Sequence, residues 1–541
     1  RDIHDRDIHD RDIHDREVHD RESNAAQHLL AVGGTVNACG EPGRPRRAMP
    51  QMPALARPTV AGIPRLEPGE RSNGMQCGAF ERAPCKARSE FMADVVQEVD
   101  RYIEEHLSEF IADLARLAAV PSVSSRGEHM EEAAGVVGEL LTAAGFNVRT
   151  MPTDGFPVVY ADSGAGQSKT LICYNHYDVQ PPEPLELWDS PPFTLSERDG
   201  RLYARGVSDD KGQLLSRIAA MRAVRAVTGG LPARVKFLVE GEEEISSPNL
   251  ETFVEHNKDL LAADACVWEF GGVNYEGRPM VVLGLRGILY VEYHVRVLSR
   301  DAHSGGAHNL PNAAWRLLRA LATLKDENGR IRIPGFYDDA KEPGEVELKL
   351  LEEMPSDEAF QREHFGVKEF VNGHTGSDYK RAVYEPTANI AGISAGWEGK
   401  GSKTVIPAAA MAKMDFRLVP DQDPQDIFAK LRRHLDQEGF EDVEVGLLGG
   451  ERAGTTPPTD PFVQVTVRTA EEVYGKPAIV DPLMGGSGPM HAFRANLGTP
   501  IVTLGPGDPL SNAHSPNESM SIENFILGTK HMTRLLVGFG E

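Results

Sequence analysis

The sequence predicts an α/β fold with a mostly parallel sheet, interrupted by an inserted α+β domain. Short apolar runs that suit buried strands, such as 170–174, 235–239 and 265–268, alternate with helical patterns such as 213–227. This alternation is typical of a parallel sheet covered by helices. At 288–297 apolar and polar residues alternate singly, which is typical of an antiparallel strand with one exposed face. Towards the C-terminus the first pattern resumes.

The other elements follow from the same reasoning. Apolar residues at helical spacing predict helices over 93–120, ended by Pro121, and over 130–144. Further strands are expected at 202–204, 280–283, 410–419 and 501–504, and further helices at 311–324, 424–434 and 523–537, with Pro311 in the first turn of its helix. We therefore divide the chain into a tail (1–91), a first α/β part (92–286), the inserted domain (287–449) and a second α/β part (450–541).

The tail, residues 1–91, is predicted to be disordered and of low complexity. It begins with the pentad Arg-Asp-Ile-His-Asp three times and then Arg-Glu-Val-His-Asp, followed by a Pro-, Gly- and Arg-rich stretch. A period of five fits neither a helix nor a strand, and such a segment buries too little apolar surface to offset its ordering entropy. Met92 stands directly before the first helical pattern, so we expect translation to start there.

The overall composition excludes several classes of partner. The chain has 57 Lys and Arg against 81 Asp and Glu, a net charge of −24, which disfavours nucleic acid and anionic membranes as partners. The five cysteines form no CxxC pair, which indicates a reducing compartment rather than a disulfide framework. The longest uncharged stretch near the start, 25–40, is too short and too polar to span a bilayer. We therefore expect a cytoplasmic protein.

Polar side chains that suit metal ions follow the predicted strands. Each fragment alone has a structural explanation, because histidine–carboxylate pairs are common and aspartates often cap helices. Together they offer two histidines and several carboxylates at strand ends of one sheet, a set that suits a pair of Zn²⁺ ions sharing one carboxylate. The fragments are His176 with Asp178, Asp209 with Asp210, the run Glu240 to Glu244, Glu269, and His514.

These motifs, in this order, resemble those of the dinuclear zinc exopeptidases and deacylases. That family includes carnosinase-like dipeptidases, carboxypeptidase G, aminoacylase, acetylornithine deacetylase and succinyl-diaminopimelate desuccinylase. The resemblance runs from about Met92 to the C-terminus and rests on the motifs NHYDVQP, RGVSDDKG, EGEEE, DAHSGG, KTVIP, RLVP and HSPNE. It implies a metal-binding catalytic domain, formed by both α/β parts, and an inserted domain that acts as a lid and dimerisation domain.

The resemblance also implies roles for individual residues. His176 and Glu269 would bind one zinc ion, and His514 and Glu244 the other, with Asp209 bridging the two. Glu243 would be the general base, and Asp178 would orient the His176 ring. The peptide bond between Asp209 and Asp210 is expected to be cis. Two Zn²⁺ ions per subunit are implied, with Co²⁺ or Mn²⁺ as substitutes.

The inserted domain carries further implied site residues. His303 would cross the interface of a homodimer and stabilise the oxyanion in the partner's site. Thr404 and Arg417 match residues that contact substrate, and Arg417 suits a carboxylate because its guanidinium can bind both oxygens. Ser487 is a further substrate-binding candidate, because its Gly-rich run precedes a helix whose N–H groups can meet an anionic group.

The expected function is hydrolysis of an amide bond, in a dipeptide or at a peptide C-terminus, by a water activated by two zinc ions. The alternative is an N-acyl-amino-acid deacylase. In the family, dipeptidases usually have Asp at the Glu269 position, whereas aminoacylases and carboxypeptidases have Glu. More remote alternatives are a non-catalytic binding protein and a serine hydrolase, the latter because residues 392–396 match GxSxG, although no helical pattern follows them.

Overall fold

The computed structural model describes residues 85–540, with side chains from Asp94 onward. The predictions for residues 1–84 therefore lie outside the described part of the chain. Helix α1 (Cys85–Glu105) begins before the predicted start at residue 93 and includes Met92, and it is followed by α2 (Leu107–Ala118) after a break at His106. No helix in the described part is long and apolar enough to span a membrane.

The main sheet has six strands in the order β1-β2-β6-β3-β7-β19. The neighbours β6, β3, β7 and β19 run parallel to one another, whereas β1 and β2 are antiparallel to their neighbours. His176, the last residue of β3, is level with Glu240, the last residue of β6. The strands are β1 (Asn147–Met151), β2 (Val158–Asp162), β3 (Thr170–His176), β6 (Arg234–Glu240), β7 (Ala265–Trp268) and β19 (Ile501–Thr503).

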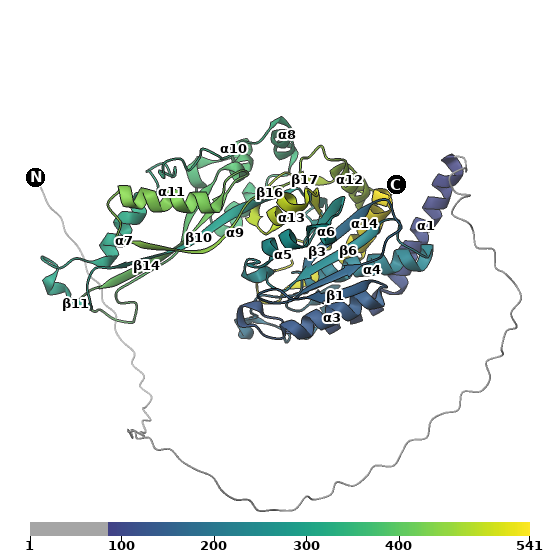
Figure 1. Ribbon diagram of the computed structural model, residues 1–541, viewed down its shortest axis with the longest axis horizontal. Helices are drawn as coiled ribbons and strands as arrows, with labels where there is room; N and C mark the ends of the chain where they lie inside the picture. The colour runs from purple at the N-terminus through teal and green to yellow at the C-terminus, as the bar shows by residue number, and fades with distance from the viewer. Residues whose placement is uncertain (1–84, 541) are drawn as a thin grey trace, which may run out of the picture. The chain divides into compact units, whose positions relative to one another are not determined.

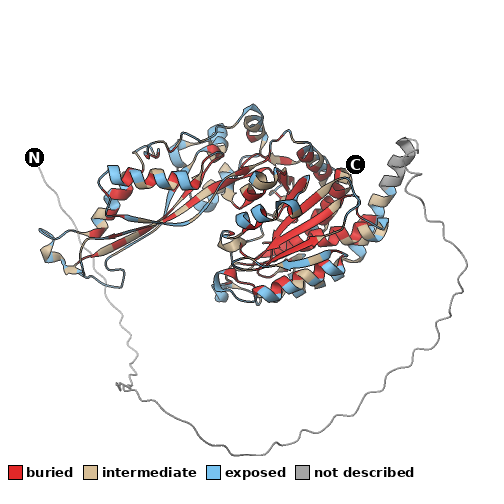
Figure 2. Ribbon diagram, viewed as in Figure 1, coloured by how far each residue is buried: buried red, intermediate tan, exposed pale blue. Residues whose placement is uncertain are grey.

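Both faces of the main sheet are covered, which explains why its central strands consist mainly of apolar residues. Successive residues of β3 enter different cores: Leu171 and Cys173 pack on one face, and Ile172 and Tyr174 on the other. The central strands β3 and β6 are buried along almost their whole length (Figure 2), while the edge strand β1 is largely exposed and the surrounding helices are exposed on their outer sides. The larger core includes side chains of α3 (Met130–Ala143), α4 (Lys211–Thr228), α12 (Pro461–Tyr474) and α14 (Ile522–Gly540), and the other includes those of α5 (Leu250–His256) and α13 (Met490–Leu497).

A second, antiparallel sheet has the order β12-β14-β10-β15 and a core of its own (Figure 1). Its strands are β12 (Thr387–Ala395), β14 (Ala409–Leu418), β10 (Gly284–Arg296) and β15 (Glu444–Glu451), and side chains of α7 (Ala313–Ala322) and α11 (Pro424–Gln437) pack into its core. The side chain of Asn312 accepts a hydrogen bond from the Trp315 N–H, so Asn312 caps α7. The prediction that Pro311 lies in the first turn is therefore wrong, because Pro311 precedes the cap.

Two strands expected in the main sheet belong to small sheets instead. The strand expected at 202–204 is β5 (Arg201–Tyr203), which pairs with β4 (Ser196–Arg198) and β20 (Ser519–Ser521). The strand expected at 280–283 is β9 (Pro279–Val282), which lies between β8 (Gly272–Val273) and β17 (Ile479–Asp481). Apolar content predicted that these segments are strands, but it carries no information about which sheet they join.

Strand β10 connects the two parts of the structure. Its first residues, Gly284 and Leu285, pair with β16 (Gly454–Thr455) and β18 (Met484–Ser487), and its later residues pair with β14 and β15. The expected boundary between residues 286 and 287 falls within this strand. The remaining elements are α6 (Lys258–Leu261), α8 (Glu345–Glu353), α9 (Glu358–Phe365), α10 (Gly376–Arg381), β11 (Ala302–His303) and β13 (Val405–Ile406).

Candidate metal centre

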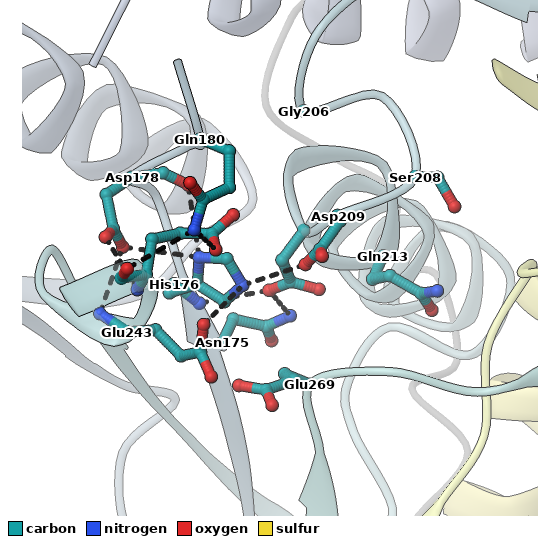
Figure 3. A network of polar contacts seen from close by, with 12 residues as sticks. Asn175, His176, Asp178, Gln180, Gly206, Ser208, Asp209, Gln213, Glu243 and Glu269 are labelled. Carbon is teal, nitrogen blue, oxygen red and sulfur yellow. Dashed lines mark hydrogen bonds and ion pairs between the residues drawn. The ribbon is translucent and has the colours of Figure 1, made fainter. Parts of the chain in front are cut away.

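Two histidines and several carboxylates converge where the parallel strands of the main sheet end. His176 is the last residue of β3, Glu243 and Glu244 follow β6, and Glu269 follows β7. His514 lies in the loop after β19, whereas Asp209 comes from the loop before α4 rather than from a strand end of the main sheet. Figure 3 shows Glu243, Asp209 and Glu269 around the His176 ring.

Asp209 lies between the two histidines. One of its carboxylate oxygens is 3.1 Å from His176 Nε2, and the other is 2.9 Å from His514 Nε2. Burial alone would raise the pKa of Asp209, but hydrogen bonds from both histidines hold it well below its usual value. In turn, hydrogen bonds to Asp209 and Glu244 raise the pKa of His514 to about 10. Asp209 is therefore a carboxylate anion, and each of its two oxygens contacts one of the two imidazoles.

Asp209, Glu244 and His514 form the first group of potential ligands. Each offers one ligand atom, and these atoms all lie within 4.8 Å of one another. One oxygen of Glu244 is 3.2 Å from His514 Nε2 and accepts a hydrogen bond of 2.9 Å from the Gln180 side chain. The other oxygen, Oε1, is buried without a hydrogen-bond partner. A buried carboxylate oxygen without a partner is costly, and a bound cation would satisfy it.

His176, Glu269 and Glu243 lie on the other side of Asp209. Glu269 is buried, and its Oε1 accepts a hydrogen bond of 3.0 Å from the Trp268 indole, while Oε2 has no partner. His176 Nε2 is 3.9 Å from a carboxylate oxygen of Glu243. Burial raises the pKa of Glu243 well above its usual value, and the negative charge of Glu269 adds to this effect. Glu243 therefore binds a proton more readily than an exposed glutamate does.

Asp178 contacts His176 on the opposite side of the ring. Its carboxylate is 3.3 Å from His176 Nδ1, and its backbone carbonyl oxygen is 3.1 Å from the same nitrogen. The Asp178 carboxylate also accepts hydrogen bonds from the backbone N–H groups of Glu243, at 3.3 Å, and Glu244, at 3.0 Å. Asp178 therefore orients the imidazole, leaves Nε2 facing Asp209, and anchors the segment that carries both glutamates.

The peptide bond between Asp209 and Asp210 is cis, as the resemblance predicts. The Asp210 carboxylate turns away from the metal centre and accepts hydrogen bonds from the Asn175 side chain, at 2.7 Å, and from the His176 N–H, at 3.0 Å. The two adjacent aspartates thus have different functions in the fold. Asp209 faces the histidines, and Asp210 holds the end of β3.

The structure adds polar residues that the sequence did not single out. Glu518, which is fully buried, accepts hydrogen bonds of 2.8 to 3.0 Å from the N–H groups of Gly206, Ser208 and Asp209 and from the Arg205 side chain. Gln180 holds Glu244, as described above. Both residues lie inside motifs on which the resemblance rests, HSPNE and NHYDVQP. Their place in these motifs was the sequence feature that could have pointed to a role at the site.

A cavity of about 470 Å³ opens beside this centre. Its wall contains Asp209, Glu243, Glu269 and His514, and Ser487 lies in the same wall. Ser487 accepts a hydrogen bond of 2.8 Å from Arg417 and donates one of 3.1 Å to the carbonyl oxygen of Gly287. The structure therefore brings Ser487 into the same cavity wall as Asp209, Glu269 and His514 and brings Arg417 next to Ser487.

His303 and Thr404 lie together but away from this centre. His303 Nε2 is 3.3 Å from Thr404 Oγ1, and both residues are exposed. They lie beyond the end of β10 that is far from the cavity. Leu285, near the start of β10, lines the cavity, and the eleven residues from there to Arg296 at about 3.3 Å each span roughly 35 Å. Among the described residues, no hydrogen bond or ion pair joins His303 or Thr404 to the metal centre of the same chain.

The GxSxG segment does not form the turn that a serine nucleophile needs. Ser394 lies within strand β12, is exposed, and donates its hydrogen bond to Glu398. The next element is the short strand β13 rather than a helix. Because a nucleophile elbow requires a strand-to-helix turn, the serine-hydrolase alternative has no structural basis here.

Comparisons with known proteins agree with this geometry. Beta-Ala-His dipeptidase of Rattus norvegicus is 28% identical over 476 residues, covering 80% of this chain and 94% of the rat protein. Cys-Gly metallodipeptidase dug1 of Schizosaccharomyces pombe is 29% identical over 457 residues, covering 79% of this chain and 95% of the yeast protein.

Solved structures with the same fold include two of special interest. An M20 family metallo-carboxypeptidase from Sulfolobus solfataricus has a TM-score of 0.77 and 38% identity, covering 80% of this chain and 99% of its own. Human carnosine dipeptidase 1 has a TM-score of 0.70 and 28% identity, covering 82% and 99%. The model of Peptidase family M20/M25/M40 matches residues 172–537, which include every residue of the metal centre. The chain therefore belongs to peptidase family M20/M25/M40.

Proposed function

We propose that this metallopeptidase hydrolyses the amide bond of dipeptides with two Zn²⁺ ions per subunit. Support for dipeptides comes from the relatives, which include Beta-Ala-His and Cys-Gly dipeptidases. Support for a metal pair comes from the donor set, because two imidazoles and three carboxylates suit zinc. The buried oxygens Glu244 Oε1 and Glu269 Oε2, which have no partner in the protein, agree with cations at both positions.

Each ion would have three protein ligands. His514 and Glu244 would hold one ion, His176 and Glu269 the other, and Asp209 would contact both through its two oxygens. Co²⁺ or Mn²⁺ would substitute for Zn²⁺ with the same ligands. When bound, the ions polarise a carbonyl oxygen and make water a stronger acid near neutral pH.

Glu243 would move the proton during hydrolysis. It lies beside His176 in the cavity wall, and the raised pKa described above makes it able to take a proton from the attacking water and return it to the departing amine. Asp178 supports this role, because it fixes the His176 ring and accepts a hydrogen bond from the Glu243 N–H. No other carboxylate of the cavity wall is both close to His176 and free of an assigned ligand position.

Arg417 and Ser487 would bind the free carboxylate of the substrate. A guanidinium can bind both oxygens of a carboxylate. The hydrogen bond between the two side chains brings the positive charge of Arg417 to the cavity wall, where Ser487 already lies. Because Ser487 lies in the same cavity wall as Glu243 and Glu269, a small substrate in the cavity could contact both this pair and the metal centre.

We also propose that the protein acts as a homodimer through the inserted domain. His303 and Thr404 are too far from the metal centre of their own chain to serve it, so their implied roles require a second chain. Edge strand β12 exposes Ile390 and Ile393, by 46% and 48%, and α7 exposes Trp315 by 63%. An exposed apolar edge of this kind is typical of an interface. His303 of each chain would then stabilise the oxyanion in the other chain's site.

Two neighbouring activities remain as second candidates. Carboxypeptidase activity is favoured by Glu269, which matches the family's carboxypeptidases, and by the 38% identity to the Sulfolobus solfataricus metallo-carboxypeptidase. N-acyl-amino-acid deacylation requires the same chemistry at the metal centre and the same carboxylate contact.

We also propose a cytoplasmic location. It is supported by Cys173 and Cys266, which are both buried and free.

The convergence of Asp209, Glu244 and His514, with their ligand atoms all within 4.8 Å of one another, carries this proposal. The experiment compares Glu243→Ala with Glu251→Ala, an exposed glutamate of α5. Both variants should bind two zinc ions per chain, measured by elemental mass spectrometry. Glu243→Ala should lose dipeptide turnover by a factor of about 10² or more, and Glu251→Ala should keep it. Undiminished turnover in Glu243→Ala would contradict the role of Glu243 as the general base.

A further inference from the structure

We propose that the cavity selects dipeptides with an apolar side chain. This inference rests on the proposed function and specifies its substrate class. Besides the proposed metal ligands, the cavity wall includes a group of aliphatic and aromatic side chains. We call this surface the apolar floor. It comprises Phe270, Val273, Met280, Val282, Leu285 and Met484.

Strand geometry explains why the floor is apolar and continuous. Met280 and Val282 are two residues apart on β9 and therefore point to the same side, into the cavity, while Val281 between them packs in the main core. Leu285 of β10 pairs with Met484 of β18, so these two side chains extend the floor across a second pair of strands. Strands β9 and β10, which follow each other in the chain, and the distant strand β18 thus build one surface.

The cavity wall contains few charged residues outside the metal centre. Apart from the residues of the metal centre, the charged residue in the wall is Asp508, and its two oxygens each accept a hydrogen bond of 3.1 Å from Arg201. The wall contains no lysine or arginine among its described residues. An acidic side chain of a substrate that lies against the floor would therefore have no basic side chain of the wall to pair with, because Arg417 and the proposed zinc ions would already bind the free carboxylate and the amide of the same substrate. A basic side chain would lose its hydration against the floor, and burying an unpaired charge is costly.

Size and adaptability favour medium and large side chains. A cavity of about 470 Å³ lies within the usual range for small ligands. Methionine side chains are flexible and fit apolar groups of different shape, and Met280 and Met484 lie at two places of the floor. A leucine, methionine or phenylalanine side chain would bury apolar area here, whereas glycine would leave the floor exposed to water.

The first experiment measures kcat/KM of the zinc-loaded enzyme for two dipeptide series, X-Ala and Ala-X, where X is Leu, Met, Phe, Gly, Glu or Lys. In at least one series the apolar residues should exceed Glu and Lys by about 10-fold or more, the discrimination that a pocket of this kind provides. Equal values across both series would overturn the inference while leaving dipeptide hydrolysis intact. Hydrolysis of N-acyl amino acids alone, with no dipeptide turned over, would instead overturn the proposed function.

The second experiment changes the floor itself with Met484→Lys. Met484 is 39% exposed, so a lysine there can keep its charge in water and the protein should fold. The ratio of kcat/KM for the Leu substrate to that for the Glu substrate should fall by about 10-fold or more, because the lysine pairs with the acidic side chain. Met411→Lys, on the second sheet, is the control and should leave the ratio unchanged. The inference is wrong if both variants change the ratio equally.

Discussion

The guanidinium of Arg217 donates a hydrogen bond of 2.8 Å to the backbone carbonyl oxygen of Glu269. The same buried group donates to carbonyl oxygens of Tyr174, at 2.9 Å, and Leu504, at 3.2 Å, and to that of Trp268. These acceptors lie at or just beyond the ends of β3, β7 and β19. One side chain of α4 therefore fixes the spacing of the strands that carry His176 and Glu269, the proposed ligands of one zinc ion.

Arg217→Lys should loosen this spacing, because an ammonium group cannot reach three strand ends at once. We expect the affinity for the more weakly held zinc ion to fall by about 10-fold to 100-fold, as for other residues that orient ligands. Competition with a chromogenic chelator measures the affinity. Arg225→Lys on the same helix, whose guanidinium donates to the Gly145 carbonyl oxygen at 2.9 Å, is the control.

Trp268→Phe removes the indole N–H that donates to Glu269 Oε1 but keeps the aromatic ring. The ring stacks on Tyr174 with centroids 4.1 Å apart, and phenylalanine preserves much of this contact. Glu269 loses the hydrogen bond that fixes its carboxylate, so zinc affinity should fall by about 10-fold or more. Trp397→Phe, in the inserted domain, should leave the affinity unchanged, and equal losses in both variants would argue against a positioning role.

Glu518→Ala should destabilise the whole fold as well as the loop that carries Asp209. The variant leaves the buried Arg205 without its ion-pair partner at 2.8 Å and leaves three backbone N–H groups without an acceptor. Breaking a buried ion pair costs about 3–5 kcal/mol. Urea unfolding of the metal-free proteins measures this free energy. Glu523→Ala, at an exposed site in α14, should remain within about 0.5 kcal/mol of the parent protein.

His531 makes the free energy of unfolding depend on pH. Burial lowers its pKa from 6.5 to about 4, and its ring contacts the Thr466 carbonyl oxygen at 3.2 Å. The folded protein keeps this ring neutral, whereas the unfolded chain binds a proton below pH 6.5. Its contribution is therefore complete above that pH and is lost as the pH falls towards 4, by about 3 kcal/mol. The experiment measures the free energy of unfolding of the metal-free parent protein and of metal-free His531→Gln across this pH range. The difference between the two should decrease by this amount as the pH falls, whereas a difference that does not change with pH would contradict the lowered pKa of His531.

Mixing two inactive variants tests whether His303 acts across a dimer. His303→Ala and Glu243→Ala should each be inactive alone. After exchange of subunits, a mixed dimer contains one site with an intact Glu243 and an intact His303 from the other chain. Activity should return to about a quarter of the parent value, because half of the dimers are mixed and one of their two sites is complete. No recovery, although mass spectrometry detects mixed dimers, would exclude this role.

The sequence was sufficient to predict that His176, Asp209, Glu244 and His514 converge, whereas their roles as metal ligands stay a prediction. Carboxyl ends of parallel strands lie at one edge of a sheet, so His176 after β3 and Glu244 after β6 were expected to converge, and they do. It was not sufficient to assign every strand. The segments that became β5 and β9 have apolar runs like those of β3, but strand pairing depends on contacts between distant segments, and a short run does not encode its partner.

Residues that support the site were harder to find than the ligands. Arg217 resembles any arginine of an amphipathic helix until the fold brings Asn175 and Glu269 to it, 42 and 52 residues away in the chain. Glu518 accepts a hydrogen bond from the Ser208 N–H, which is 310 residues away in the chain. Strand β12 was not predicted either, because its small residues and glycine lack the alternation typical of strands, and its pairing with β14 determines its conformation.

The continuity of β10 has a mechanical consequence. Leu285 at its start belongs to the substrate cavity, and the residues from Gly287 onward pair with β14 in the second sheet. Because one continuous strand joins both regions, a tilt of that sheet would displace the floor of the cavity at the other end of the strand. We therefore expect contacts made by the inserted domain, including those of the proposed dimer, to affect the shape of the space proposed for the substrate side chain.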